Sequence, residues 1–527
     1  MIQKQRIQRS SLWRACFYVV LFPALAFIHI SLRDYVADDA YIHVRIAQHL
    51  VEHGVPYFNV HEPIMASSSP LYTITLFLAF SIFGVNLLTL AILNSLATCL
   101  CALVFSRLAR RVLASESFRV DLCVTVVVVS LLLESSISLM ETPLALLVLG
   151  QGIHFYLGRR PVSFVFLCAA VFLRIELAVF FLSFVAHSLY TRRIGPGQIV
   201  LCALLGGVPW VLYDLYFFRT ILPQTMEAKS AVFSLNIMQF AMITYRYLYG
   251  PHLSFNLRWL LIVHAVAAPW MFLATFLKGR PAFRDDKVLK SALLLFLPGA
   301  TILAVYAAKR VLPFQWYLPL FLVPMFIGMF LVAYARKSAL IRFAFAFFVF
   351  PVVLNLAINT CAALGYPGLY SDFVFGARTR QYMRVGYALQ RKYPDATLLT
   401  TEIGALGFAF GGTIHDAAGL VSPAALKYHP MHVPQERSLG YIGAIPPEFV
   451  HEVKPDIIVS YDVFIEELMR SDLLDEYVHE SIPALLPGDA AVADHRQLWF
   501  GQQLHVFVRK EIDLGPIQKE SDRENLD

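Results

Sequence analysis

Two adjacent carboxylates, Asp38 and Asp39, open a segment with the periodicity of an amphipathic helix, and Gly54 and Pro56 mark its end. Asp is favoured at the N-cap position of a helix, which Asp38 could occupy. Asp39 could then be an acid of the first turn that complements the helix dipole. One capping acid is enough to start a helix. The second carboxylate could therefore act as a general base for a hydroxyl group or as a metal ligand, although nothing in the sequence requires a divalent cation.

Other charged residues lie at the ends of long apolar runs, where such residues often mark a functional site. Arg174 could bind an anion through charge-assisted hydrogen bonds, or it could only pair with Glu141 or Glu176. Lys229 could bind the same anion, or it could only extend its ammonium group toward the membrane surface. Two further candidate cations are Arg219 and Arg246.

The composition excludes a purely soluble protein. Of the 527 residues, 58% are hydrophobic and 15% are charged, where an ordinary soluble domain has ~25% charged residues. The apolar runs end near residue 362, which predicts a membrane region over 1–362, an α/β domain over 363–515 and a disordered tail over 516–527. The net charge is +6, and the basic residues are spread over the loops between runs, which favours membrane topology over nucleic-acid binding.

The basic clusters between the apolar runs predict eleven crossings, with the N-terminus in the cytoplasm and the C-terminal domain outside. The runs lie near 16–32, 86–106, 120–138, 143–157, 162–190, 198–217, 257–277, 289–308, 314–335 and 342–362. Because 162–190 is basic at both ends, both ends should lie in the cytoplasm, so the run must enter the membrane and return to the same side. It is nevertheless too short for two full crossings. We therefore expect two short helices that meet at Arg174-Ile175-Glu176. A shorter run, 70–84, should lie along the outer surface.

The C-terminal segment mixes strand-like and helical patterns. Strands are predicted over 397–401, 456–460 and 504–508, and a helix over 379–392. At the end of one apolar run, Trp316-Tyr317 is more typical of an interfacial aromatic belt than of a platform that binds a sugar ring.

The order of several short motifs carries a resemblance to a known superfamily. These motifs are Asp38-Asp39-Ala40-Tyr41-Ile42, Tyr57-Phe58-Asn59, Ser67-Ser68-Ser69-Pro70-Leu71-Tyr72, Met140-Glu141-Thr142, Arg174-Ile175-Glu176 and Leu222-Pro223-Gln224-Thr225 with Lys229. In this order they resemble the GT-C membrane glycosyltransferases, especially mycobacterial terminal arabinofuranosyltransferases and bacterial pilin arabinosyltransferases. The resemblance covers about residues 34–230, and a weaker similarity continues over 401–421. Ile175 and Gln224 depart from the family, which usually has Pro and Asn there.

The resemblance implies a GT-C-like fold and a sugar donor on a polyprenyl phosphate. It implies an acceptor glycan or protein of the cell envelope, outside the bacterial cytoplasmic membrane. In that superfamily, and in the similar oligosaccharyltransferases, the first outer loop carries the catalytic acid, which favours Asp39 over Asp38. The residues expected to bind substrate are Tyr41, Glu141, Arg174, Glu176, Thr225 and Lys229.

Two other classes of protein compete with this interpretation. A transporter or flippase for a lipid-linked saccharide should gather polar residues near the middle of the membrane, in repeated halves. In this sequence the polar residues gather at one face, and no internal repeat is visible. A non-catalytic partner in envelope assembly is the third possibility.

Overall fold

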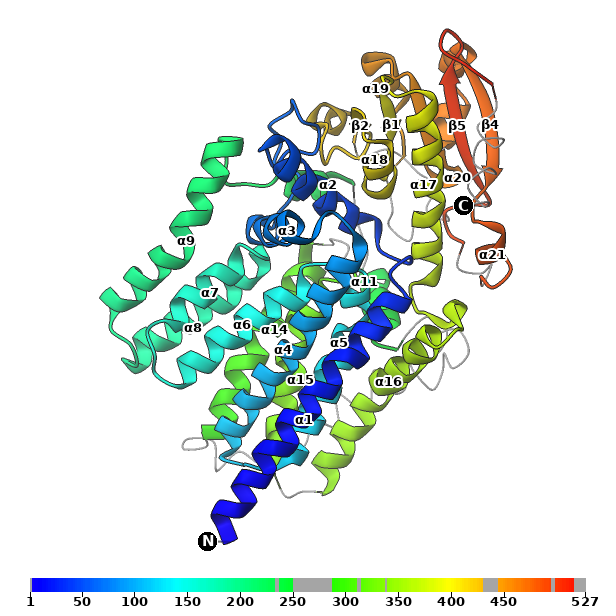
Figure 1. Ribbon diagram of the computed structural model, residues 1–527. Coiled ribbons are helices and arrows are strands. Elements are labelled where there is room, and N and C mark those ends of the chain that lie inside the picture. Colours follow the sequence, from blue (N-terminus) through cyan, green and yellow to red (C-terminus); the bar gives the residue numbers. More distant parts are fainter. Residues whose placement is uncertain are drawn as a thin grey trace.

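The computed structural model describes residues 2–232, 237–249, 287–309, 314–336, 339–429, 444–493 and 498–515. Within these ranges, seven helices are long and apolar enough to cross a membrane, so the chain is a multi-pass membrane protein. They are α1 (Ile2–Ser31), α4 (Leu87–Leu113), α5 (Phe118–Ile137), α9 (Pro196–Phe218), α14 (Lys287–Lys309), α15 (Leu318–Ala335) and α16 (Ala339–Ala363). Figure 1 shows them as a slanted bundle beneath a separate C-terminal layer.

These seven helices coincide with seven of the predicted crossings. The predicted crossing at 143–157 is a shorter apolar helix, α6 (Thr142–Leu157). The run 162–190 folds as α7 (Ser163–Val171), the 3₁₀ turn η1 (Ile175–Leu177) and α8 (Ala178–Thr191), which confirms the predicted break at Arg174. The run 257–277 lies outside the described residues, so the count of eleven stays a prediction.

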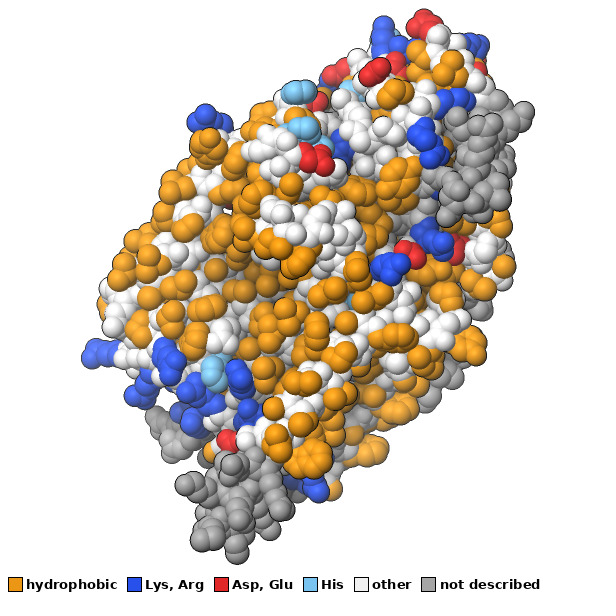
Figure 2. Space-filling model, viewed as in Figure 1, with side chains coloured by type: hydrophobic (Ala, Val, Ile, Leu, Met, Phe, Trp, Pro, Cys, Tyr) orange, Lys and Arg blue, Asp and Glu red, His pale blue; other side chains and the backbone are white. Residues whose placement is uncertain are grey.

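The surface of the bundle is that of a protein in lipid. Figure 2 shows a broad hydrophobic belt, with Lys and Arg side chains gathered at its lower end and charges of both signs at its upper end. Arg111 donates to the His154 carbonyl (2.8 Å) and Arg193 to the Leu157 carbonyl (2.8 Å), so the basic loops after α4, α6 and α8 lie together. We call this the basic end of the bundle, and the opposite end the domain end.

The basic end should face the cytoplasm, because short loops rich in Lys and Arg are retained there during insertion. We expect reporter fusions after Lys287 to give a cytoplasmic signal, and fusions after Lys229 and Glu402 to give an external one. Paired reporters, one active only in the cytoplasm and one only outside, measure this directly. A cytoplasmic signal at Glu402 would contradict both the orientation and an external site at the domain end.

The C-terminal domain is built on a five-stranded mixed sheet in the order β2-β1-β3-β5-β4. Its strands are β1 (Leu398–Thr400), β2 (Ile414–Asp416), β3 (Ile457–Tyr461), β4 (Tyr477–Pro483) and β5 (Gln503–Arg509), which confirms the three predicted strands. β1 is parallel to β2 and β3, whereas β5 is antiparallel to β3 and β4. Its helical segments are η3 (Pro367–Leu369), α17 (Phe373–Lys392), α18 (Gly404–Phe410), η4 (Pro423–Tyr428), α19 (Pro447–Val453), α20 (Asp462–Met469), η6 (Asp472–Glu476) and α21 (Pro487–Ala490).

Short helices separate the bundle from this domain. α2 (Asp38–His53) and α3 (Pro70–Phe83) lie at the domain end, below β2 and α18 (Figure 1). α3 is too short to span a bilayer, in keeping with the predicted surface helix. α10 (Gln224–Val232) and α11 (Ile237–Tyr249) follow α9. Three of the motifs singled out in the sequence, those on α2, α3 and α10, therefore lie between the bundle and the C-terminal domain.

Candidate active site

α2 presents two functional faces. Residues three or four apart on a helix share a face, so Asp39 and His43 lie on one side, and Asp38, Tyr41 and Arg45 lie on another. The contacts of His43 place the first face toward the bundle, and those of Tyr41 and Arg45 place the second face toward the C-terminal domain. The helix ends at Gly54, whose φ of 72° is the left-handed cap expected from the sequence.

On the bundle side, His43 joins α2 to buried polar residues. Its Nε2 lies 3.7 Å from Glu141 Oε2, and its Nδ1 lies 3.2 Å from the hydroxyl of Ser67. The ring of Tyr72 packs edge-on against it, with centroids 5.3 Å apart. Asp39 is thus one helical turn from a histidine that contacts Glu141, a proximity that the sequence did not reveal.

Arg174 holds two glutamates. Its guanidinium donates to Glu141 Oε1 (2.6 Å) and, through two nitrogens, to both oxygens of Glu176 (2.5 and 3.1 Å). The cation also lies over the ring of Tyr317, 3.7 Å from its centroid, and the hydroxyl of Tyr306 donates to Glu176 (2.5 Å). Two carboxylates therefore surround one buried cation. This geometry favours the pairing role of Arg174 over the binding of a substrate anion.

The local fold explains why these residues meet. The backbone of Arg174 is extended (φ −154°, ψ 117°) in the break between α7 and η1. Its side chain therefore enters the bundle at the gap between these two helices. Ser69, just before α3, holds this break, because its hydroxyl donates to the Leu173 carbonyl (2.6 Å). Glu141 immediately precedes α6 and is fully buried. The broken run and the two loops thus bring their charged residues to the domain end.

On the opposite face of α2, Asp38 does not cap its own helix. The N-cap is Ala37, without a side-chain hydrogen bond, so the expected capping role is wrong. The carboxylate of Asp38 instead accepts the backbone N–H groups of Gly404 (3.0 Å) and Ala405 (2.8 Å), at the start of α18. Burial raises the pKa of Asp38 to about 6, and the neighbouring negative charge of Asp39 acts in the same direction.

Arg45 of α2 and two motif residues, Asn59 and Tyr41, also contact the C-terminal domain. Arg45 donates to the carbonyls of Phe58 (2.8 Å) and Gly412 (2.6 Å), and Asn59 exchanges two hydrogen bonds with the backbone of Ile414 (2.9 and 3.1 Å). Tyr41, expected to bind substrate, packs its ring against Phe408 of α18, with centroids 5.5 Å apart. A large part of the first motif thus docks one part of the chain onto another.

The C-terminal domain adds an ion pair that the sequence did not identify as part of a site. Arg378 and Glu402, both buried, form a 2.8 Å pair. Burial raises the pKa of Glu402 to about 7, Arg378 lowers it, and the charges of Asp38 and Asp39 raise it further. Glu402 is therefore electrostatically coupled to the acidic start of α2.

The two remaining predicted substrate residues lie on α10. Thr225 is half-buried in its first turn. Lys229 belongs to the same helix, but its side chain lies outside the described part of the structure. The neighbouring Gln224 connects both halves of the site, because its N–H donates to the Met65 carbonyl (3.0 Å) and its side chain reaches the Gly419 carbonyl (3.5 Å).

Trp316 and Tyr317 do not form an interfacial belt, so that prediction is wrong. Each is 7% exposed, and Tyr317 covers the guanidinium of Arg174. The backbone carbonyl of Trp316 accepts the hydroxyl of Thr142, at the start of α6 (2.5 Å). A pair of aromatic residues at the end of an apolar run gives the same sequence pattern whether it faces lipid or the protein interior.

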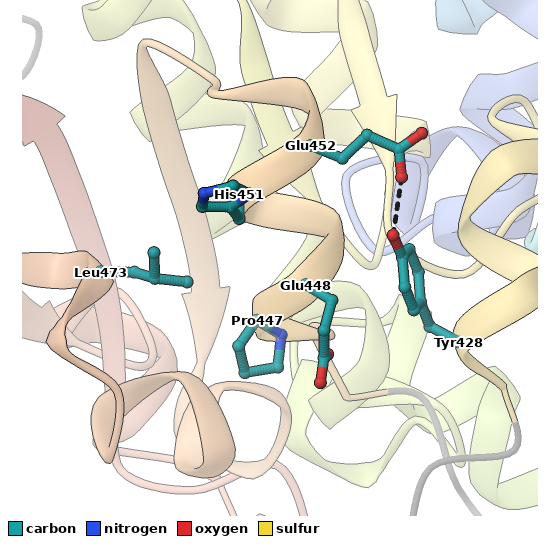
Figure 3. A pocket seen from close by; sticks show the side chains of 6 residues that line it. All are labelled: Tyr428, Pro447, Glu448, His451, Glu452 and Leu473. Atoms are coloured by element: carbon teal, nitrogen blue, oxygen red, sulfur yellow. Dashed lines mark hydrogen bonds between the residues drawn. The ribbon is translucent and has the colours of Figure 1, made fainter.

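The surface of the C-terminal domain also has a shallow depression of about 510 Å³. Its lining residues are Tyr428, Pro447, Glu448, His451, Glu452 and Leu473 (Figure 3). The hydroxyl of Tyr428 donates to Glu452 (2.7 Å), and Lys427 pairs with the same carboxylate (2.6 Å). The described residues contain no group of three or more His, Cys, Asp or Glu arranged to hold a metal ion.

A bundle of membrane helices with a broken helix pair, covered by an α/β domain that docks on α2, is a GT-C-like fold. Two solved structures of ArnT share it. ArnT from Cupriavidus metallidurans, bound to undecaprenyl phosphate, aligns over 95% of this chain and 99% of its own, with a TM-score of 0.52 and 14% identity. Its apo state gives the same TM-score and identity over 95% and 100%. The apo oligosaccharyltransferase of Archaeoglobus fulgidus is 11% identical, with a TM-score of 0.44 over 84% and 69%.

Comparisons of sequence add one match. A family model described as "Domain of unknown function (DUF8728)" matches residues 373–506, which is most of the C-terminal domain. No curated protein matches the chain.

Proposed function

We propose that this protein is a membrane glycosyltransferase that moves one sugar from a polyprenyl phosphate to an acceptor at the domain end of the bundle. The observation that carries the proposal is the face of α2 that joins Asp39, through His43, to the buried Glu141–Arg174–Glu176 group. Titratable groups converge there at one end of the membrane bundle, as external transfer from a membrane lipid requires. The GT-C-like fold, shared with an ArnT that binds undecaprenyl phosphate, supports the class of donor.

In the proposed reaction, Asp39 takes the proton of the acceptor hydroxyl as that oxygen attacks the anomeric carbon of the sugar. The new bond joins the acceptor oxygen to this carbon, and the bond from this carbon to the phosphate oxygen breaks. The polyprenyl phosphate leaves with the electron pair. Glu141, Arg174 and Glu176 order the wall of the site beneath α2.

The finer proposal concerns the substrates. From the order of its motifs, we infer that the sugar is a pentofuranose such as arabinofuranose. The acceptor would be a glycan or protein of the envelope, outside a bacterial cytoplasmic membrane. A transporter or flippase for a lipid-linked saccharide is the alternative, but it would need a polar path through the bundle rather than a site at one end.

The test is mass spectrometry of the product formed by purified protein from defined polyprenyl-phosphate sugars. We expect transfer of one sugar residue, with the lipid phosphate as the second product. Equally efficient use of a soluble sugar nucleotide would reject the lipid donor. Movement of the intact lipid-linked saccharide between leaflets, without cleavage, would favour the alternative.

The leaving phosphate needs a cation, and Arg174 already serves two carboxylates. We therefore assign this role to Lys229 and expect Lys229→Ala to raise the KM for the lipid donor about 10- to 100-fold, the loss of one charge-assisted hydrogen bond of ~1.5–3 kcal/mol. Initial rates at varied donor concentration measure it, and the control is Arg470→Ala, which removes an exposed cation of the C-terminal domain that pairs with Glu466 and Glu467. An unchanged donor KM would exclude Lys229 from donor binding.

A further inference from the structure

The start of α2 and the start of α18 meet directly, although they belong to opposite ends of the chain. The two oxygens of Asp38 accept the N–H groups of Gly404 and Ala405. The first N–H groups of any helix lack partners within that helix, and a carboxylate that accepts them also complements the helix dipole. Asp38 thus caps a helix that lies 366 residues further along the chain.

The contact is a close approach of two backbones. A Cβ at position 404 would collide with the carbonyl oxygen of Asp38, so only glycine fits there. At position 407, a Cβ would lie 2.9 Å from the ring of Phe58, which is closer than side chains allow. α18 therefore packs closely against α2 and against the loop that follows α2, with Gly404 and Gly407 at the two points of contact.

The segment that leads into α18 is also fixed. Glu402 pairs with Arg378 (2.8 Å), and the guanidinium of Arg378 lies 5.1 Å from the ring centroid of Trp499 and 5.2 Å from that of Phe500. A cation held among aromatic rings and paired with a buried carboxylate has little freedom to move. The N–H groups that Asp38 accepts are thus presented by a rigid part of the domain.

The structure assigns Asp38 as a positioning residue: by binding the start of α18, it fixes the first turn of α2 and thereby the adjacent Asp39. This rests on the function proposed above. Both oxygens of Asp38 are already bound to main-chain donors, and its helical face points to the C-terminal domain rather than to His43 and Glu141. A displacement of about 1 Å in a catalytic group can lower the rate ~10²-fold. Docking of the C-terminal domain on Asp38 therefore controls the rate through the position of Asp39, although Asp38 does not contact the reacting atoms.

The experiment combines hydrogen exchange with kinetics on the full-length protein in detergent. Exchange measured by mass spectrometry reports the N–H groups of Gly404 and Ala405, and turnover is measured with defined polyprenyl-phosphate sugars. We expect Asp38→Ala and Gly404→Ala to lose protection of these N–H groups and to lower kcat about 10²-fold, with the donor KM unchanged. Asp38→Asn keeps one good acceptor oxygen. Its kcat and its protection of the two N–H groups should therefore lie between those of Asp38→Ala and wild type. Asp39→Asn should lose kcat while the protection stays intact.

A matched control lies in the same domain. Asp462 accepts two backbone N–H groups, those of Gln502 (2.6 Å) and Gln503 (2.9 Å), but it does not cap α18. Asp462→Ala therefore removes the same number of main-chain hydrogen bonds, and with them the contact between Asp462 and His505 (2.6 Å). We expect it to leave protection at 404–405 and kcat near wild type. A large loss of kcat in this control would show that any weakening of the domain stops turnover, which would overturn the specific role of Asp38.

Other outcomes are equally decisive. If Asp38→Asn is inactive while the N–H groups of Gly404 and Ala405 stay protected, Asp38 acts on the reacting atoms and the assignment is wrong. If Asp38→Ala loses protection but keeps its kcat, docking does not position Asp39. Should Asp38→Ala fail to fold, Asp38→Asn and Gly404→Ala decide in its place. If wild-type protein transfers no sugar, the proposed function fails, whereas the exchange pattern still decides whether Asp38 holds α18.

Discussion

Asp39→Asn should abolish sugar transfer and leave the protein folded. A general base must take up a proton, which an amide cannot do, and its loss typically lowers the rate ~10²–10⁴-fold. The stability of the fold depends much less on the carboxylate of Asp39, because α2 begins after Ala37 and uses no side-chain cap. A first-turn acid contributes only ~0.3–1 kcal/mol through the helix dipole. Turnover of a polyprenyl-phosphate sugar and thermal unfolding, measured on the same preparation, separate the two effects.

The control for this variant is Glu52→Gln, which removes an exposed carboxylate from the other end of α2 and should keep wild-type turnover. If Asp39→Asn turns over like wild type while Asp38→Asn is inactive, the assignment within the pair is reversed. If both variants stay active, the carboxylate pair is not catalytic.

Arg174→Met should destabilise the protein by ~3–5 kcal/mol, the typical cost of removing one partner from a buried ion pair. The variant keeps an unbranched apolar stem in place of the arginine but leaves Glu141 and Glu176 close together without their cation. It also removes the cation that lies over Tyr317. Thermal unfolding in detergent at neutral pH measures the loss, and transfer activity should fall with it.

Glu176→Gln is the matched control for Arg174→Met, because it removes one charge from the same ion-paired group but leaves the remaining charges balanced. Glu176→Gln leaves one cation and one carboxylate, Arg174 and Glu141, and the amide oxygen can still accept the hydroxyl of Tyr306. We expect it to destabilise the protein far less than Arg174→Met does. Equal stability of wild type and Arg174→Met would mean that both carboxyl groups are neutral in the folded protein, which would contradict the ion-paired description.

Much of the fold follows from local pattern. The limits of α2, the break at Arg174 and the predicted strands of the C-terminal domain match the structure. They depend on residues within a few positions of one another, such as the periodicity that ends at Gly54 or the charges that flank 162–190. The gathering of Glu141, Arg174 and Glu176 could also be predicted, because the basic loops place all three at the same end of the bundle.

What the sequence could not reveal depends on contacts between distant segments. A capping acid has the same local pattern whichever helix it caps, so the sequence predicts that Asp38 caps α2, whereas in the structure it caps α18. Tyr306 lies inside an apolar run, where nothing distinguishes a tyrosine that donates to Glu176 from one that packs in the core. The sequence could not show what Arg45 and Asn59 bind, because their backbone partners are about 360 positions away.

The contact between Asp38 and Gly404 has a consequence for biogenesis. At a synthesis rate of ~5–20 residues per second, the start of α2 waits roughly 20–70 s before the residues that bind Asp38 are made. Until then, the helices can insert into the membrane, but the first turn of α2 lacks its docking partner. We expect the nascent chain to be inert toward lipid-linked sugar, and a chain truncated before residue 404 to integrate into the bilayer without ever acquiring activity.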